Sequence, residues 1–192
     1  MTPEEFLEIL HRANNLKINT RHNWTMGERK ESVADHSWRI ALMAMLLSQE
    51  DEFKDVDMNK VIRMCLIHDL GEAFTGDIPA FEKNHNDETK EDELFFDWVK
   101  QFPKPQKDEW NSLLKEMIAL ETKEAKTYKS LDKLEALIAH DEADINTWLP
   151  LEYDLQMTYG KDIIQFSPYL TSLREAIDKM TQEKIEKEST QK

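Results

Sequence analysis

Apolar residues recur every three or four positions through most of this chain, a spacing that places them along one side of successive helices. The first such segment starts with Thr2, Pro3 and Glu5, the residue types of an N-cap, a first helical position and a capping box. We expect this helix to run to about residue 16. Further helical patterns begin after Ser32 and Asp57 and recur at residues 90–102, 106–120, 123–145 and from 168 onward.

No segment alternates apolar and polar residues as a half-buried strand does, and residues 19–30, NTRHNWTMGERK, are typical of an exposed loop. The 192 residues suffice for one domain with a substantial core, and the 4 glycines and 6 prolines rarely interrupt the helical patterns. The sequence therefore predicts an all-α fold, a single compact helical bundle over residues 1–185. Its motif core is expected at residues 20–145 and its C-terminal helices at 146–185, followed by a frayed, charged tail at 186–192.

Acidic side chains outnumber basic ones by 39 to 25, for a formal net charge of −14. This field repels the phosphate backbones of DNA and RNA, so we expect no nucleic-acid partner. We also expect no membrane association, because no stretch approaches the ~20 apolar residues that cross a bilayer. Cys65 is the only cysteine, so no intrachain disulfide can form. Because nothing argues for an oxidising compartment, we expect a cytoplasmic location.

Polar residues interrupt the apolar run at residues 65–77, CLIHDLGEAFTGD, which contains His68, Asp69, Glu72 and Asp77. On a helix that continues to about Gly71, His68 and Glu72 would share a face and Asp69 would stand beside Glu72. Burying several carboxylates is costly unless a cation compensates their charge. The sequence therefore indicates a divalent metal ion at this position.

A metal site needs ligands from other helices as well, because one imidazole and one carboxylate do not make a strong site. His36 is a candidate, since it lies in the first turn of a long apolar helix. A fourth ligand is expected from residues 123–145, where Asp132, Asp141 and Asp144 qualify. Spacing gives Asp132 only a slight preference and leaves all three open. The remaining histidines have no partner pattern and are expected at the surface: His11, His22, His85 and His140.

These segments resemble the HD-domain metal-dependent phosphohydrolases, a family named for a His-Asp doublet that here is His68-Asp69. RHNWTMGERKESVADHS, HDLGEAFTGDIP and KSLDKLEALIAHDEAD are similar to the branch containing the bacterial 5′-deoxynucleotidases, over most of residues 5–145. The resemblance implies an HD-domain helical bundle that binds one divalent metal ion. The family pattern H…HD…D assigns its ligands to His36, His68, Asp69 and Asp132.

The resemblance also implies roles for residues around the metal ion. The acid one turn after the doublet and the aspartate of the following GD, here Glu72 and Asp77, adjoin the metal-bound water in that branch and are the expected catalytic residues. Arg21 and Trp24 match residues that line the nucleotide pocket and are the expected substrate contacts. Two residues separate them here, whereas the pair is adjacent in characterised relatives.

Together these residues predict a hydrolase that removes phosphate from (deoxy)nucleoside 5′-monophosphates by attack of a metal-activated water. Glu72 would position or deprotonate this water, and Asp77 would protonate the leaving oxygen. The ion could be Mn, Co, Fe, Ni, Zn or Mg, because mixed His and carboxylate ligands admit each of them. The alternatives are an HD-type phosphodiesterase acting on another small nucleotide, such as a cyclic nucleotide, and a non-catalytic metal-binding scaffold. A homodimer is expected, formed through an apolar helix face that the sequence does not identify.

Overall fold

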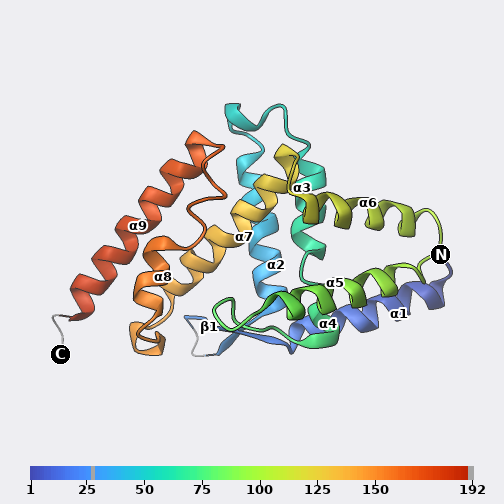
Figure 1. Ribbon diagram of the computed structural model, residues 1–192, viewed down its shortest axis with the longest axis horizontal. Helices are drawn as coiled ribbons and strands as arrows, with labels where there is room; N and C mark the ends of the chain where they lie inside the picture. Colours follow the sequence, from blue (N-terminus) through green and yellow to red (C-terminus); the bar gives the residue numbers. More distant parts are fainter. Residues whose placement is uncertain (27–28, 190–192) are drawn as a thin grey trace.

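The protein is described by a computed structural model, which covers residues 1–26 and 29–189. Helices build most of it, and one two-stranded sheet follows the first helix, at the end of that helix away from the N-terminus (Figure 1). The predicted all-α class is confirmed, apart from this small sheet. In chain order the elements are α1 (Pro3–Ala13), a 3-10 turn (Asn14–Lys17), β1 (Thr20–Trp24), β2 (Lys30–Ser32), α2 (Val33–Leu47), a 3-10 turn (Asp51–Phe53), α3 (Met58–Ile67), α4 (Glu72–Thr75), α5 (His85–Val99), α6 (Gln106–Ala119), α7 (Lys123–Glu142), a 3-10 turn (Ile145–Thr147), α8 (Glu152–Thr158) and α9 (Pro168–Ser189).

Side-chain caps start the first three helices where the sequence predicts them. Thr2 Oγ1 accepts a hydrogen bond from the Glu5 N–H at 3.2 Å, and the Glu5 carboxylate accepts one from the Thr2 N–H at 2.6 Å. Ser32 and Asp35 form the same reciprocal pair at the start of α2, and Asp57 caps α3. These bonds satisfy amide groups that the first turn of a helix leaves free. The predicted starts of α1, α2 and α3 are therefore confirmed.

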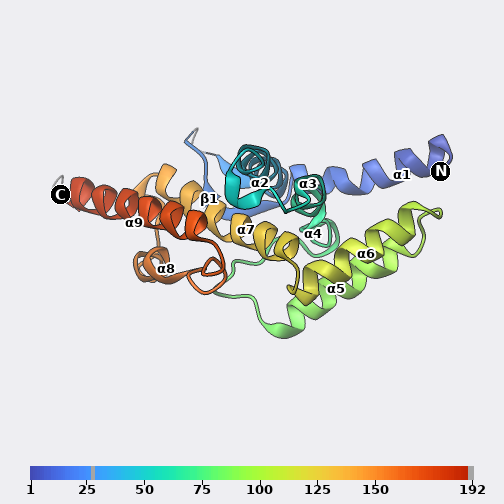
Figure 2. The same cartoon turned by 90° about the horizontal axis from the view of Figure 1, so that it is seen from above.

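The core lies where α2, α3 and α7 pack against one another, at the centre of Figure 1. Burying one large apolar side chain contributes about 1.5–3 kcal/mol, so this contact holds the three helices firmly. In both views α9 lies along one side of the molecule, and α5 with α6 extends on the other (Figures 1 and 2). Apolar side chains buried at the central contact include Ile40, Ala44, Val61, Met64, Leu131 and Leu134.

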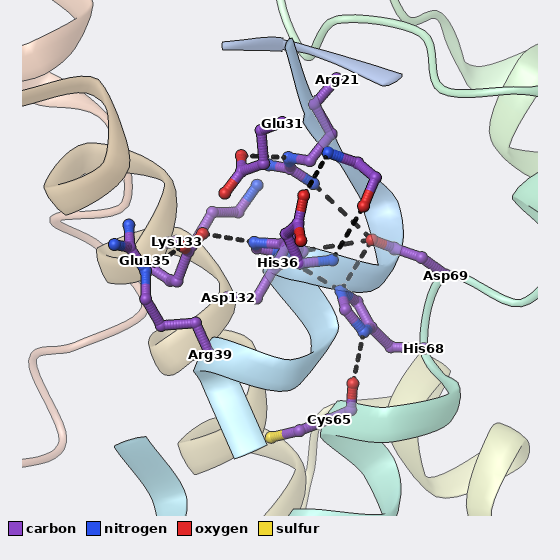
Figure 3. A network of polar contacts seen from close by, with 12 residues as sticks. Arg21, Glu31, His36, Arg39, Cys65, His68, Asp69, Asp132, Lys133 and Glu135 are labelled. Atoms are coloured by element: carbon purple, nitrogen blue, oxygen red, sulfur yellow. Dashed lines mark hydrogen bonds and ion pairs between the residues drawn. The ribbon is translucent and has the colours of Figure 1, made fainter. Parts of the chain in front are cut away.

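A β-hairpin replaces the loop that the sequence predicts at residues 19–30, and that prediction is wrong. β1 and β2 are antiparallel, with Thr20 paired to Ser32 and Trp24 paired to Lys30. The strand escaped prediction because polar side chains occupy both faces of β1, and most of that strand is half-buried. The hairpin leads directly into α2, so it carries Arg21 close to the first turn of that helix (Figure 3).

α3 ends at Ile67, earlier than the predicted end near Gly71. A tight connection follows, in which the Glu72 N–H donates to the Asp69 oxygen at 3.0 Å, and α4 then begins. A β-carbon on Gly71 would lie 2.6 Å from Cγ of Glu91, so the close approach of α5 requires glycine there. The prediction that one continuous helix carries His68 and Glu72 is therefore wrong, because α3 ends before His68 and Glu72 begins α4.

The later part of the chain differs from prediction in two places. The helical patterns at 106–120 and 123–145 have no obvious break between them in the sequence, but α6 and α7 are separated at Leu120, where φ is 51°, and Thr122 caps α7. α9 continues as a helix through Ser189, and residues 190–192 of the expected tail lie outside the described residues. Within residues 1–26 and 29–189, no helix is long and apolar enough to cross a membrane.

Candidate metal centre

Four side chains, from α2, α7 and the residues directly after α3, meet at the centre of the fold (Figure 3). His36 lies in the first turn of α2, His68 and Asp69 directly follow α3, and Asp132 lies midway along α7. His36 Nε2 is 3.2 Å from Asp132 Oδ1 and 3.9 Å from Asp69 Oδ2. His68 Nε2 is 3.0 Å from Asp69 Oδ2 and 3.7 Å from Asp132 Oδ1. The structure thus brings together all four residues that the sequence assigns to the metal ion.

Both imidazole rings present Nε2 to this centre, because other groups hold their Nδ1 atoms. His36 Nδ1 is hydrogen bonded to Glu135 Oε2, and Arg39 Nε donates to Glu135 Oε1 at 2.6 Å. His68 Nδ1 donates to the backbone oxygen of Cys65 at 2.9 Å. An imidazole held in this way keeps a fixed ring orientation and a more basic free nitrogen, which favours metal binding.

Two buried atoms of the cluster, His68 Nε2 and Asp69 Oδ2, make no hydrogen bond within the described residues. They lie 3.0 Å apart but are not aligned for a hydrogen bond. Leaving a buried polar group unpaired costs about 1–3 kcal/mol. A divalent cation would satisfy both atoms, because imidazole nitrogen and carboxylate oxygen are common ligands of such ions. The residues at this centre therefore fit one divalent metal ion.

Protons compensate the acidic charge of this cluster when no cation is bound. Burial by itself lowers the pKa of His68, but the Asp69 and Asp132 carboxylates outweigh it and raise that pKa to about 10. Burial by itself raises the pKa of Asp69, yet the His68 and His36 imidazoles lower it below its ordinary value. Binding of a metal ion must therefore displace protons from the imidazoles.

Asp132 belongs to this cluster, whereas the other two candidates for the fourth ligand do not. Its Oδ2 accepts a hydrogen bond from Lys129 Nζ at 2.7 Å, while its Oδ1 faces the histidines. Asp141 instead accepts a hydrogen bond from Thr181 Oγ1 at 2.8 Å. Asp144 caps the 3-10 turn after α7. The long helix α7 thus delivers one of its three candidate acids to the centre.

Two further acids, Glu72 and Asp77, stand beside the cluster. Glu72 is 3% exposed, and its Oε2 makes no hydrogen bond among the residues described. Carboxylate oxygens of Asp69, Glu72 and Glu91 lie within 4.8 Å of one another. Burial, together with the charges of Asp69 and Asp77, raises the pKa of Glu72 to about 10, and burial also raises the pKa of Asp77. Glu72 therefore holds a proton at neutral pH when no cation is near.

Arg21 reaches the cluster, whereas Trp24 lies apart from it. Arg21 Nη1 is 3.6 Å from Asp69 Oδ2, and Arg21 Nε is 3.4 Å from Glu31 Oε2. Trp24 has the Lys30 ammonium 4.7 Å from its ring centre and lines a separate hollow. The structure therefore brings one of the two expected substrate residues to the centre.

An open cavity of about 130 Å³ adjoins the cluster. Arg21 and Asp77 line this cavity, and both also lie close enough to Asp69 to interact with its charge. Phe81, Leu137 and Tyr159 contribute apolar surface from the loop after α4, from α7 and from the end of α8. A ligand that reaches the metal centre with one end can therefore place an apolar or aromatic part in the cavity.

His22 and His140 line this cavity. The predicted surface position is wrong for His140, which is 8% exposed, whereas the side chain of His22 is 28% exposed. His22 Nε2 lies 3.1 Å from Glu152 Oε1, and His140 Nε2 lies 3.5 Å from Glu152 Oε2. His140 also stacks on Trp148, with ring centres 4.5 Å apart. Because Glu152 begins α8, its carboxylate connects that helix to β1 and α7 around the cavity.

Comparison with known proteins agrees with this geometry. The family model of the HD domain matches residues 13–173. This chain belongs to the HD-domain family. The family predicted from the sequence motifs is therefore confirmed.

Relatives of this HD-domain chain include two proteins named 5′-deoxynucleotidase HDDC2. The Homo sapiens protein is 30% identical over 140 residues, which cover 71% of this chain and 67% of that protein. The Dictyostelium discoideum protein is 37% identical over 84 residues, which cover 41% of this chain and 44% of that protein. The structure of a predicted metal-dependent phosphohydrolase from Magnetospirillum magnetotacticum MS-1 has a TM-score of 0.78 and 27% identity, over 94% of this chain and 93% of that one.

Sequence reasoning missed three residues that surround the ligands of this HD domain. Glu135 lies three residues after Asp132 and Arg39 lies three after His36, so helical spacing was a usable signal for both. Glu31 offered no such signal, because only the pairing of β1 with β2 brings it to the site.

Proposed function

We propose that this HD-domain protein removes phosphate from deoxynucleoside and nucleoside 5′-monophosphates with the help of one divalent metal ion. The observation that carries the proposal is that Arg21 faces Asp69 at 3.6 Å and also lines the cavity. A nucleotide whose phosphate lies at the metal centre can thus place its nucleoside in the cavity. The similarity to the 5′-deoxynucleotidases supports this substrate class.

His36, His68, Asp69 and Asp132 are the residues that would hold the ion. A bound divalent ion would supply Lewis-acid polarisation of a phosphoryl oxygen and would lower the pKa of a coordinated water. Glu135 keeps the His36 ring in place. Mn, Co, Fe, Ni, Zn and Mg all suit a mixed set of imidazole and carboxylate ligands.

Glu72 and Asp77 are proposed to handle the protons of the reaction. Glu72 would orient the attacking water or take its proton, which requires the ionised form that a nearby positive charge favours. Asp77, whose pKa burial raises, would donate a proton to the leaving 5′ oxygen. Because such groups contribute about 10²–10⁴-fold, Glu72→Gln and Asp77→Asn should each lower kcat by about 10²-fold or more. Unchanged metal content in both variants would separate these roles from metal binding.

Arg21 and the cavity walls are proposed to bind the substrate. The guanidinium offers several N–H donors to phosphate oxygens, and Phe81 with Leu137 offers apolar surface to the nucleoside. The role of Trp24 in preferring a deoxyribose stays a prediction from the sequence. If Trp24→Ala lowers the ratio of kcat/KM for deoxynucleotides to kcat/KM for ribonucleotides, that role is supported. An unchanged ratio would show that Trp24 does not contact the sugar.

A phosphate-release screen tests the proposed activity. Metal-stripped protein is reloaded with each candidate metal and given ribo- and deoxynucleoside 5′-monophosphates, with a cyclic nucleotide for comparison. We expect release from the monophosphates, and none from stripped protein or from Asp69→Ala. Turnover of the cyclic nucleotide alone would indicate a phosphodiesterase. Metal retention without turnover of any substrate would indicate a scaffold.

We also propose that the protein is a homodimer in which a second copy covers exposed apolar side chains of α1 and α2. None of the residues of α1, which is described in full, is buried, and Leu7 is 63% exposed. On α2, Trp38 is 62% and Leu46 is 68% exposed. Exposed apolar patches of this kind are typical of interaction sites. Light scattering should give twice the chain mass of 22.7 kDa, and Leu7→Glu with Leu46→Glu should give the monomer. A monomeric wild type would contradict the proposal.

The cytoplasm is the proposed location, and a small molecule is the proposed partner. The buried free thiol of Cys65 suits a reducing compartment. The net charge of −14 opposes binding to nucleic acid and to anionic membranes. Cell fractionation should place the protein with cytoplasmic markers, and mobility-shift and vesicle-sedimentation assays should detect no binding.

A further inference from the structure

Glu31 is a buried carboxylate beside the metal centre that has no role in the reaction proposed above. It lies on β2 and is 5% exposed, and its Oε2 makes no hydrogen bond in the part of the chain described. A buried carboxylate is costly unless an opposite charge compensates it. The opposite charge here is Arg21, whose Nε lies 3.4 Å from Glu31 Oε2.

The register of the hairpin produces this pair. Thr20 pairs with Ser32, which makes Arg21 and Glu31 neighbours across the two strands, and the register shifts before Trp24. Side chains opposite each other in an antiparallel pair have β-carbons about 4.5–5.5 Å apart, close enough for an ion pair. Folding of the hairpin therefore brings the carboxylate to the guanidinium before any ligand binds.

Arg21 is held from two sides, as Figure 3 shows. Its Nε faces Glu31, and its Nη1 lies 3.6 Å from Asp69 Oδ2. Both distances exceed those of good hydrogen bonds, so charge confines Nε on the side of Glu31 while the Nη groups stay available to a ligand. Both Arg21 and Glu31 line the cavity next to the metal centre. A guanidinium held in place before binding loses less conformational entropy when it receives an anion.

We propose that Glu31 is a positioning residue for Arg21. It fixes the guanidinium between the cavity and the metal centre, so that the free N–H groups meet the phosphate of the substrate. This role rests on the proposed nucleotide phosphohydrolase activity, and Glu31 itself does not touch the substrate. If Glu31 merely stabilised the hairpin, its removal would lower stability without depending on Arg21.

A double-mutant cycle distinguishes these two roles. Glu31→Ala should lower kcat/KM by about tenfold or more, because the arginine loses its position. In an Arg21→Ala background the same change should alter kcat/KM by less than about threefold, since residues that act through one another are not additive. Glu31→Gln, which keeps the size and an acceptor oxygen, should restore part of the activity. An equal loss from Glu31→Ala in both backgrounds would overturn the proposal.

Glu116→Gln is the matched control for this cycle. Glu116 is a part-buried carboxylate that accepts a hydrogen bond from Lys60 at 2.9 Å, and it is absent from the cavity lining. The control should leave kcat/KM unchanged in both backgrounds. A loss in the control equal to that of Glu31→Ala would mean that any weakened ion pair has this effect, and the positioning role would fail.

A second measurement needs no turnover, so it separates failure of this inference from failure of the proposed function. The Nε–H signal of Arg21, assigned by its loss in Arg21→Lys, reports hydrogen exchange with water. Exchange should be at least about tenfold faster in Glu31→Ala than in wild type and unchanged in Glu116→Gln, because confined groups open less often. Equal exchange in wild type and Glu31→Ala would overturn the positioning role, whether or not the protein hydrolyses nucleotides.

Discussion

Glu135 on α7 and His36 on α2 are hydrogen bonded to each other, and both side chains are completely buried. The bond holds Nδ1 of His36, so Nε2 of the same ring must face the metal centre. The orientation of the His36 ring thus depends on how two core helices pack, rather than on a loop. Sites held by rigid elements and supporting hydrogen bonds keep their geometry best.

Glu135→Gln should weaken metal binding, because the His36 ring loses a charged partner. Loss of such a supporting partner typically costs about 10- to 100-fold in metal affinity. Competition with a chelator measures the change. Glu142→Gln is the control, since Glu142 also pairs with Arg39 but its side chain is 39% exposed. Unchanged metal affinity in Glu135→Gln would show that the ring does not need this bond.

Glu72 should make the metal-free protein less stable as the pH rises. Its pKa in the folded protein is about 10, against an ordinary value of 4.5. Between these values the unfolded chain releases a proton that the folded chain retains, so the free energy of unfolding falls with increasing pH. Glu72→Gln cannot ionise and should raise the Tm of metal-free protein, by more near pH ~8 than near pH ~6. Melting curves with an equal shift at both pH values would contradict this.

Gly71→Ala should disturb the connection that carries the His-Asp doublet. The new β-carbon would lie 2.6 Å from Cγ and 3.2 Å from the backbone oxygen of Glu91. Relief requires movement of α5, and overpacking of this kind costs about 1–3 kcal/mol. Chemical denaturation measures the loss. Adding Glu91→Ala should restore part of the stability, because it removes the closer contact but not the backbone one. A free energy of unfolding in Gly71→Ala equal to that of wild type would contradict the close approach of α5 to Gly71.

The helices that carry His36 and Asp132 were more predictable than the segments between the helices. His36 and Asp132 lie on capped helices with clear apolar faces, so local signals sufficed to place them. The end of α3 was misjudged because it depends on the approach of α5 at Gly71, a contact distant in sequence. The hairpin was missed for a similar reason. Its charged side chains pair across the strands, as Arg21 does with Glu31, and a one-dimensional pattern does not record that pairing.

Arg174→Ala should loosen α8 and with it one wall of the cavity. Arg174 is 2% exposed, donates from Nη2 to the Gln156 oxygen at 2.5 Å and pairs with Asp178 at 2.6 Å. Breaking a buried pair costs about 3–5 kcal/mol. Because Gln156 lines the cavity, KM for a nucleotide should rise more than kcat falls. Lys179→Ala, on the exposed face of α9, should change neither stability nor KM. An unchanged KM in Arg174→Ala would show that the position of α8 does not affect substrate binding.

The central claim is that His68 and Asp69 hold a metal ion on which phosphate release depends. The most direct measurement is the rate of phosphate release from a deoxynucleoside 5′-monophosphate, taken together with the metal content of the same sample. Stripped wild-type protein should release no phosphate, reloading should restore the rate, and Asp69→Ala should neither retain metal nor recover activity. Full activity in the stripped protein, or in metal-free Asp69→Ala, would contradict the claim.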